Sequence, residues 1–264
     1  MSLNDSSWQM PEAAVVEFLD KQHDYCLCIP VFNEGTRIKK ELEHMNTLNI
    51  TALVDILILD GGSTDGSTNR DFLNSQKVRT LLVNHGDGRL SSDYRMGFAY
   101  ALRQGYKGII TIDGNNKDDP EGISRFIEAL EADYDFVQGS RFISGGKAIN
   151  TPWSRAIAIR LLHAPLISLG AGFWYTDTTN GFRAYNRRFL LDPRVKPFRE
   201  VFYSYELLAY LSVRAPRTGY RVKEIPVTRA YPLGEEIPTK ISGLKANLKL
   251  MTIILKAITG KYNP

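Results

Sequence analysis

The sequence predicts an α/β domain with a mostly parallel central sheet and helices on both faces. Short runs of apolar and β-branched residues alternate with amphipathic segments, and several of these runs end abruptly in polar turns. The chain has 264 residues, 43% of them apolar, which is enough to bury the core of a single domain of this class. Its net charge of +4 does not by itself point to nucleic acid, and we expect no nucleic-acid partner.

The first three strands are predicted from apolar runs that end in polar or glycine-containing turns. Residues 25–31 are almost continuously apolar, and apolar residues then recur at helical spacing, which predicts a strand, a turn and an amphipathic helix. Residues 54–59 form the second buried strand and end in a glycine-rich turn over 60–67. The third strand, over 78–83, leads into the loop 85–88 and another helix with an apolar face.

The fourth strand, over 108–112, stops at Asp113 and lies at the centre of the predicted site. Pro120 opens the following helix, because proline is favoured in the first turn. A fifth strand, over 135–138, ends at the Gly-Ser-Arg segment 139–141. Open α/β sheets bind ligands at the carboxyl ends of their strands, so the polar turns should converge on one edge.

The C-terminal third departs from this alternation. Residues 153–170 predict a long apolar helix interrupted by Pro165, which we expect in the core rather than as a trough for a lipid tail. Residues 177–185 predict a polar loop that enters a short strand. A helix over 204–213 and a strand over 222–227 follow.

We expect an N-terminal extension over 1–24, the α/β domain over 25–237 and an amphipathic basic helix over 238–264. Such a helix suits either a membrane surface or packing on the sheet, and we favour packing while keeping peripheral membrane contact as a hypothesis. The sequence shows no signal peptide and no stretch long enough to span a bilayer. We therefore expect a cytoplasmic protein, at most peripheral at the inner face of the membrane, with Cys26 and Cys28 as reduced core thiols.

Oxygen-bearing side chains crowd the turn after the fourth strand. These are Asp113, Asn115, Asp118 and Asp119. Hard divalent cations take oxygen ligands and are often held by one or two carboxylates plus substrate phosphates. An acidic turn that merely caps the next helix is the equal alternative. A dinucleotide-binding fold is disfavoured because no Gly-x-Gly-x-x-Gly follows the first strand.

Five polar motifs stand in order along the chain, each at a strand end or in a loop. They are Pro30-Val31-Phe32-Asn33-Glu34, the turn 60–65, Asp113-Gly114-Asn115, Gly139-Ser140-Arg141 and the loop 177–185. Together they resemble the inverting family 2 glycosyltransferases of GT-A fold, over roughly residues 25–227. The last two motifs resemble those of polyprenyl-phosphate sugar synthases of the dolichol-phosphate mannose synthase type.

The resemblance implies a nucleotide-diphosphate sugar donor and a divalent cation, Mg²⁺ or Mn²⁺. The expected donor-binding residues are Pro30, Asn33, Glu34, Asp60, Gly62, Ser63, Gly88, Arg89 and Lys117. Asp113 and Asn115 would hold the metal, which stabilises the charge that develops on the leaving diphosphate. Asn115 departs from the family's Asp-x-Asp, so Lys117 would contact the diphosphate directly, or Asp118 or Asp119 would complete the metal shell.

The implied acceptor is a polyprenyl phosphate or a growing envelope glycan, as in polysaccharide biosynthesis. A lipid phosphate is already anionic and needs no general base, and Arg141 and Arg183 would orient it. A sugar hydroxyl would need a carboxylate to take its proton, for which the candidates are Asp177, Asp119 and Glu206. For either arginine, a structural ion pair is the alternative.

Two other functions remain open at this point. A sugar-1-phosphate nucleotidyltransferase shares the sheet architecture but requires a glycine-rich basic loop after the first strand, which residues 30–34 lack. A non-catalytic nucleotide-sugar-binding protein or membrane-surface scaffold is suggested by Asn115 and Lys117, and it would bind nucleotide without turnover. Substitution of Asp113 by Ala separates these functions, because it abolishes transfer only in a catalyst.

Overall fold

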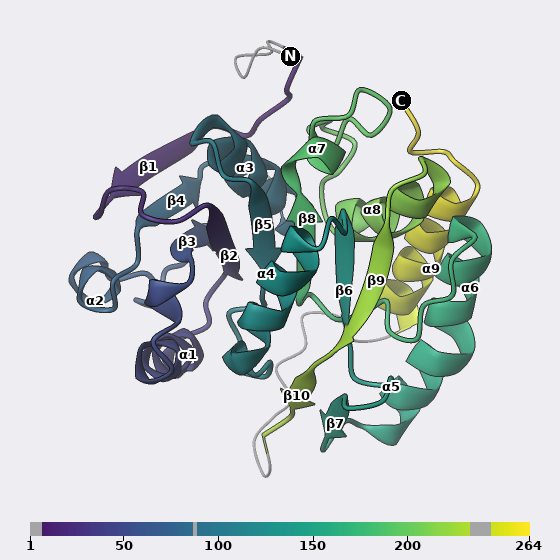
Figure 1. Cartoon of the computed structure of the whole chain (residues 1–264), viewed down its shortest axis with the longest axis horizontal. Helices are drawn as coiled ribbons and strands as arrows, with labels where there is room; N and C mark the ends of the chain where they lie inside the picture. Colours follow the sequence, from purple (N-terminus) through teal and green to yellow (C-terminus); the bar gives the residue numbers. More distant parts are fainter. Residues whose placement is uncertain (1–6, 87–88, 233–243) are drawn as a thin grey trace.

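The computed structural model describes residues 7–86, 89–232 and 244–264, with side chains from residue 248 onward in the last range (Figure 1). One sheet contains the strands β1 (Ala13–Glu17), β2 (Tyr25–Val31), β3 (Asp55–Asp60), β4 (Thr80–Asn84), β5 (Gly108–Thr111), β6 (Phe136–Ser140), β8 (Arg183–Asn186) and β9 (Val222–Pro226). Their spatial order is β1-β4-β3-β2-β5-β8-β6-β9. β1 and β8 pair antiparallel with their neighbours and the other pairs are parallel, which confirms the predicted mostly parallel sheet.

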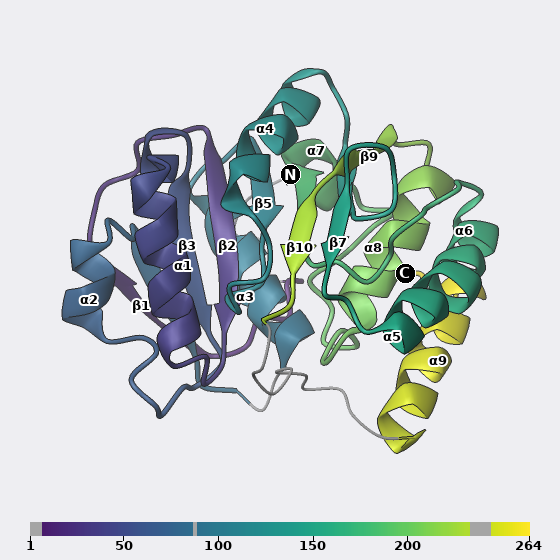
Figure 2. The same ribbon diagram turned by 90° about the horizontal axis from the view of Figure 1, so that it is seen from below.

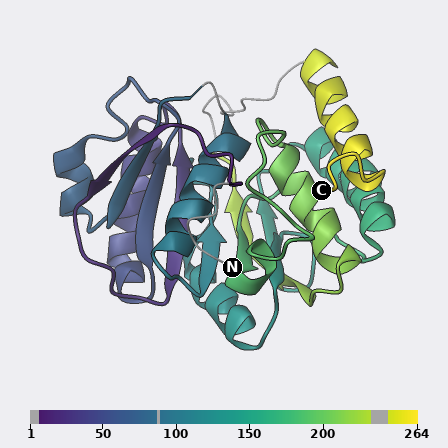
Figure 3. The ribbon, with the colours of Figure 1, turned by 90° about the horizontal axis from the view of Figure 1, so that it is seen from above.

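Helices cover both faces of this sheet, as predicted. The helical segments are α1 (Thr36–Thr47), η1 (Ile50–Ala52), α2 (Arg70–Ser75), α3 (Leu90–Arg103), η2 (Pro120–Gly122), α4 (Ile123–Glu131), α5 (Trp153–Ala158), η3 (Ile159–His163), α6 (Ala164–Ala171), α7 (Arg187–Leu190), α8 (Glu206–Arg217) and α9 (Leu244–Ile258). Alternate side chains of β2 enter two cores: Cys26 and Cys28 pack with α3, α6, α8 and α9, whereas Leu27 and Ile29 pack with α1 and α4 (Figure 3). Both cysteines are free and buried.

β1 lies within the segment 1–24 that we expected to precede the domain. It pairs with β4 from Ala13↔Asn84 to Glu17↔Thr80 and forms an edge of the sheet. This part of the expected extension therefore belongs to the sheet. The strand is half-exposed, and its apolar run, Ala13 to Val16, is shorter than the run that predicted β2.

A two-stranded parallel sheet links the C-terminal third to the turn after β5. Its strands are β7 (Lys147–Ile149) and β10 (Thr228–Ala230), neither of which was predicted (Figure 2). The Asp119 N–H donates to the Thr228 carbonyl at 3.0 Å, and the Ala230 N–H donates to the Lys117 carbonyl at 2.8 Å. These two hydrogen bonds hold β10 beside the acidic turn after β5, where the candidate site lies.

The segment 153–170 differs from the predicted core helix. It consists of α5, the π-helical turn η3 and α6, and α5 contains no buried residue. α6 does pack in the core, where Ile167 is 2% exposed. Pro165 does not break the helix, because it lies at the junction of the π-helical turn η3 and α6, where the regular α-helical hydrogen bonds are already interrupted. The expectation of a core helix was therefore wrong for the first half of the segment.

α9 packs against α6 and α8 through Ile253, Ile254 and Ala257. A Cβ on Gly170 of α6 would lie 2.5 Å from Cβ of Ile258, so this glycine permits the close approach of the two helices. Residues 238–243 of the expected basic helix lie outside the described residues. Within the described ranges, no helix is both long and apolar enough to cross a membrane.

Candidate active site

The carboxyl ends of β2, β3 and β5 lie side by side, because the three strands pair in parallel and in register. The Gly61 N–H donates to the Val31 carbonyl at 2.9 Å, and the Asn33 N–H donates to Ser63 Oγ at 3.0 Å. The turns after β2 and β3 are thus joined directly. The prediction that polar turns meet at the carboxyl ends of the strands is confirmed for the turns after β2 and β3.

Asp60 organises the turn after β3. Its Oδ1 accepts the Gly62 N–H at 3.1 Å and the Ser63 N–H at 2.8 Å, and its Oδ2 accepts the Thr68 hydroxyl at 2.9 Å. Gly62 has φ +89°, a conformation that favours glycine. The Asp60 carboxylate is 3% exposed. It therefore shapes the turn that the expected donor-binding residues share.

Two further expected donor residues lie in the turn after β2. Asn33 has φ 52°, and its Oδ1 accepts the Thr64 N–H at 2.8 Å, so the two turns are joined a second time. Glu34 is buried and accepts from Arg37 Nε at 2.9 Å. Pro30 contributes its carbonyl, which a Cβ on Gly114 would approach to 3.0 Å. All three lie at the predicted edge.

Arg229 bridges the acidic turn after β5. Its Nη2 lies 3.0 Å from Asp113 Oδ2, and its Nη1 donates to Asp118 Oδ2. Burial lowers the pKa of Arg229, but the charges of Asp118 and Asp113 outweigh this effect and raise it above the ordinary value. The Asp113 side chain retains 25% exposure, so it faces the open edge of the site.

Buried polar groups surround this bridge. Lys117 is 4% exposed, and its Nζ lies 4.8 Å from the centre of the Tyr231 ring. Burial, and then the charge of Arg229, lower the pKa of the Lys117 amine. Glu41 of α1 is fully buried, and its Oε2 accepts the Asn116 N–H at 2.9 Å. Burial raises the pKa of the Glu41 carboxyl well above its ordinary range.

The oxygen atoms beside Asp113 fit a cation, although they form no carboxylate cage. Asn115 Oδ1 is buried and has no hydrogen-bond partner among the described residues. Asn115 Nδ2 lies 3.5 Å from Asp113 Oδ2, so the amide stands next to the carboxylate. The described part of the chain holds no cluster of three His, Cys, Asp or Glu residues suited to a metal. One carboxylate and one amide oxygen match the magnesium sites that substrate phosphates complete.

Arg141 and Asp177 form a buried ion pair. Arg141 Nε lies 2.6 Å from Asp177 Oδ2, and Arg141 Nη2 lies 2.9 Å from Asp177 Oδ1 and 2.8 Å from Thr179 Oγ1. The two residues are 4% and 0% exposed. A carboxylate held in this way is unsuited to take a proton from an acceptor, and the guanidinium does not face the open edge. The pair fixes the loop 177–185 to the end of β6, and the expected roles of the two residues toward an acceptor stay predictions.

Arg183 is also an internal residue, although the loop motif marked it as a phosphate ligand. It is 1% exposed. Its Nε donates to the Asn180 carbonyl at 2.9 Å, Nη1 to the Leu208 carbonyl at 2.9 Å and Nη2 to the Thr178 carbonyl at 2.8 Å. With its donors directed at backbone carbonyls, Arg183 is not placed to grip a phosphate.

The other two candidate bases are engaged in local hydrogen bonds. Asp119 Oδ1 caps η2 by accepting the Glu121 N–H at 3.0 Å. Glu206 Oε2 accepts the N–H groups of Tyr203 and Ser204 at the start of α8. Arg89 is exposed at the N-cap of α3, and Gly88 lies outside the described residues.

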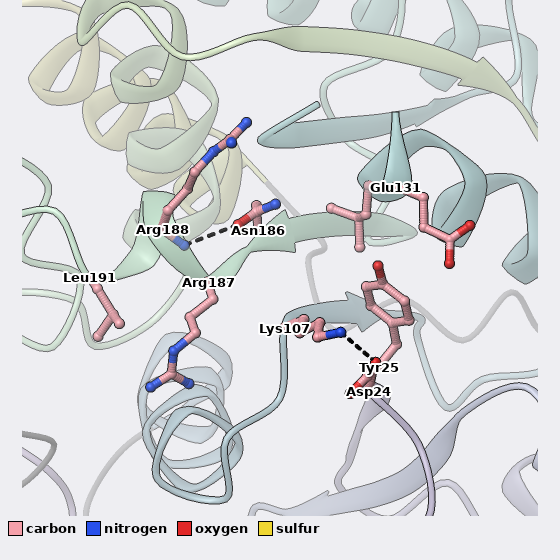
Figure 4. A pocket seen from close by; sticks show the side chains of 9 residues that line it. Asp24, Tyr25, Lys107, Glu131, Asn186, Arg187, Arg188 and Leu191 are labelled. Atoms are coloured by element: carbon pink, nitrogen blue, oxygen red, sulfur yellow. Dashed lines mark hydrogen bonds and ion pairs between the residues drawn. The ribbon is translucent and has the colours of Figure 1, made fainter. Parts of the chain in front are cut away.

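A pocket of about 690 Å³ opens at the amino ends of β2 and β5, opposite the carboxyl ends that form the candidate site (Figure 4). Its cations are paired: Lys107 Nζ lies 2.7 Å from Asp24 Oδ2, and Arg188 Nη1 lies 3.1 Å from Asp133 Oδ1. Arg187 Nη1 donates to the Leu102 carbonyl at 2.7 Å. None of the residues predicted for the site lines this pocket.

Residues 26–192 match the model of a protein family described as glycosyl transferase family 2. The chain belongs to this family. It is 30% identical over 204 residues to the polyprenol monophosphomannose synthase of Mycolicibacterium smegmatis, covering 76% of this chain and 75% of that protein. The undecaprenyl-phosphate mannosyltransferase of Micrococcus luteus is also 30% identical over 204 residues, with coverage of 76% and 81%.

Solved structures of glucosyl-3-phosphoglycerate synthase from Mycobacterium tuberculosis share the fold of this family 2 glycosyltransferase. The complex with Mn²⁺, uridine diphosphate and phosphoglyceric acid superposes with a TM-score of 0.60 at 14% identity, covering 89% of this chain and 75% of that one. The predicted GT-A fold, the resemblance and the assignment as an enzyme are thus confirmed.

The sequence did not identify Arg229, Tyr231 or Glu41 as parts of this glycosyltransferase site. Arg229 lies 116 residues from Asp113 in the chain, and no motif surrounds it. Arg229 follows the predicted strand 222–227 by two residues, but nothing in the local sequence indicated its distant partners. Glu41 lies three residues after Ile38 and four before Met45 in α1, so its helical spacing on the apolar face was the available signal.

Proposed function

We propose that this glycosyltransferase moves a sugar from a nucleoside diphosphate sugar to a polyprenyl phosphate, with inversion at the sugar. The observation that carries the proposal is the convergence of Asn33, Asp60 and Asp113 on one sheet edge. The names of the two relatives, which act on polyprenol and undecaprenyl phosphate, support the lipid acceptor. The lipids in these names support action at the surface of a membrane.

In this proposal the turns after β2 and β3 bind the nucleoside, and Asp113 with Asn115 holds Mg²⁺ or Mn²⁺. Glucosyl-3-phosphoglycerate synthase, which shares the fold, has been solved with Mn²⁺ and uridine diphosphate, and this supports a cation and a nucleotide as ligands of such a site. When bound, the cation offsets the negative charge that develops on the leaving diphosphate. Arg229 holds Asp113 Oδ2 and leaves the other carboxylate oxygen to face the donor. Lys117 lies two residues from Asn115 and would contact the diphosphate.

The acceptor phosphate would bind on the side of Tyr231. Three cations approach this ring: Lys117 Nζ at 4.8 Å and the guanidinium carbons of Arg155 and Arg229 at 5.8 and 6.0 Å. We propose that Lys117 and Arg155 orient the phosphate in place of Arg141 and Arg183, while Arg229 stays paired with Asp113 and Asp118. A lipid phosphate attacks without a general base, which agrees with the engagement of Asp177, Asp119 and Glu206 in hydrogen bonds.

A thermal-shift panel tests donor binding. UDP, GDP and CDP are each added with and without Mn²⁺, because a ligand at about 100 times its Kd stabilises the native state by about 2.7 kcal/mol. We expect one nucleotide to raise the Tm in a metal-dependent way. Stabilisation that needs no metal would assign the diphosphate contact to Lys117 alone, and no shift with any nucleotide would refute donor binding.

A transfer assay with a short-chain isoprenyl phosphate tests the reaction. Asp113→Ala is expected to abolish transfer while the Tm stays close to that of the wild type. Asp71→Ala, which removes an exposed carboxylate from α2, is the matched control and should keep full activity. Metal-dependent nucleotide binding without transfer by the wild type would favour a non-catalytic donor-binding protein.

A further inference from the structure

The helix that runs through α5, η3 and α6 exposes large apolar side chains to solvent. Trp153 is 77% exposed, Leu161 75% and Leu169 73%, and Trp174 just beyond α6 is 68% exposed. We call these four residues, together with Ile157 and Leu162, the α5–α6 face. Scattered apolar residues are ordinary on a surface, whereas a contiguous group with two tryptophans marks an interaction site.

The π-helical turn η3 keeps these residues on one side of the helix. Trp153 and Leu169 are sixteen positions apart, which an ideal α-helix of about 100° per residue would place roughly 160° from each other. A π turn inserts one extra residue and so reduces the separation to about 60°. Ile157 lies about 40° from Trp153. The irregular turn therefore produces one continuous apolar stripe.

The helical elements that carry the stripe contain cations and no acids. The sequence has no Asp or Glu between Asp135 and Asp177, and Arg155 and Arg160 lie within α5 and η3. α9 packs beside α6 and adds the exposed Leu248 and Leu255, with the exposed Lys249 and Lys256 next to them (Figure 1). The chain contains no acid after Glu236. The surface is thus apolar at its centre and positive around it.

We propose that the α5–α6 face docks the protein on an anionic lipid bilayer. Apolar side chains with tryptophans at the two ends of the stripe suit the boundary between headgroups and acyl chains, where indole rings are enriched. Arginines and lysines beside the stripe suit anionic headgroups. A second copy of this chain is a poorer occupant, because a two-fold interface places the same cations of both copies next to each other.

The docking face continues into the active site. Arg155 of α5 donates from Nη1 to the Tyr231 hydroxyl at 2.9 Å, and the Tyr231 ring lies beside Lys117 and Arg229. A bilayer on this face would therefore present a lipid phosphate at the cation-lined side of the site. This last link depends on the proposed acceptor, whereas the docking does not.

Co-sedimentation with vesicles tests the docking. The wild type is expected to sediment with vesicles of phosphatidylcholine and phosphatidylglycerol, and less with phosphatidylcholine alone. The double variant Leu161→Glu with Leu169→Glu should bind at least about tenfold more weakly, because it places charge in the apolar stripe. Leu53→Glu, at a residue 41% exposed after η1, is the matched control and should bind like the wild type.

Tryptophan emission provides an independent readout. The sequence has three tryptophans, and Trp8 stacks on Phe198 at 4.1 Å between ring centres. Anionic vesicles should shift the wild-type emission to shorter wavelength. The shift should vanish in a variant with Trp153→Phe and Trp174→Phe, which retains Trp8.

The outcomes separate docking from the proposed reaction. Absence of vesicle binding by the wild type, or equal binding by the double variant, overturns the docking proposal. A dimer that the double variant splits, in a wild type that ignores vesicles, assigns the face to a second copy and also overturns it. Vesicle binding without transfer to a short-chain isoprenyl phosphate leaves docking intact and refutes the proposed function. Transfer without vesicle binding refutes docking and leaves the proposed function intact.

Discussion

Replacing Arg141 by Met is expected to destabilise the protein strongly, because it leaves Asp177 charged and buried without its partner. The substitution removes the contacts of 2.6 and 2.9 Å to the carboxylate and the contact of 2.8 Å to Thr179. The hydrogen bonds that remain to Asp177 are longer, at 3.2 Å from the Thr179 N–H, 3.2 Å from the Thr179 hydroxyl and 3.3 Å from the Arg141 N–H. Asp177 is 0% exposed, so water cannot replace the guanidinium.

Removing one partner of a buried ion pair typically costs about 3–5 kcal/mol. This is a large share of the roughly 5–15 kcal/mol by which a domain is stable. Urea unfolding followed by circular dichroism measures the loss, and a fall in Tm of about 6–20 °C should accompany it. Asp177→Leu should cost a similar amount, because it leaves the arginine charge unpaired.

The double variant of Arg141→Met with Asp177→Leu distinguishes a buried pair from two unrelated residues. No uncompensated charge remains in it, so its loss should be smaller than the sum of the single losses by about 2 kcal/mol or more. Single losses below about 1 kcal/mol, as for exposed pairs, would refute the reasoning. Additive losses would show that the two side chains do not interact.

Three further changes test individual contacts. Arg183→Met should cost about 3 kcal/mol or more in urea unfolding, because it leaves one buried and two partly buried carbonyls without their donor. Arg125→Met on the exposed side of α4 should stay within about 0.5 kcal/mol, and equal losses would contradict the internal role of Arg183. Gly181→Ala places a Cβ 2.2 Å from Asp113 Oδ1 and should lower transfer about 100-fold by displacing that carboxylate; unchanged kcat/KM would refute the contact. Because burial raises the folded-state pKa of Glu41, its contribution to stability is fully present below the unfolded pKa of about 4.3 and is lost as the pH rises through the folded value. The Tm of the wild type relative to Glu41→Gln should therefore fall with rising pH, and a constant or rising difference would contradict the assignment.

The central strands could be predicted because strands covered on both faces are apolar throughout. The same rule missed β1, which lies at an edge and is half-exposed. It also misassigned the segment 153–170, because apolar composition does not reveal whether a helix face meets the core or the solvent. Composition predicts which residues prefer burial, and tertiary packing decides which of them achieve it.

Much of the donor side of the site followed from local patterns. Asn33, Asp60 and Asp113 each end a strand, so their position at the edge follows from the topology. Motif position did not reveal that Arg141 and Arg183 are buried, since exposure depends on loops that pack over them. The place of Arg229 in the site could not be predicted from local sequence, because its partners Asp118 and Asp113 are more than a hundred residues away in the chain.

The pairing of β7 with β10 brings a segment from beyond the family match into the active site. The match to the family model ends at residue 192, yet Arg229 and Tyr231 lie on the segment that this small sheet holds against Asp113. Lys117 and Arg155 lie inside the matched portion, so the cations around Tyr231 come from both sides of residue 192. A chain cut at the end of the family match would keep Asp113 but lose the guanidinium that holds it and Asp118 in place.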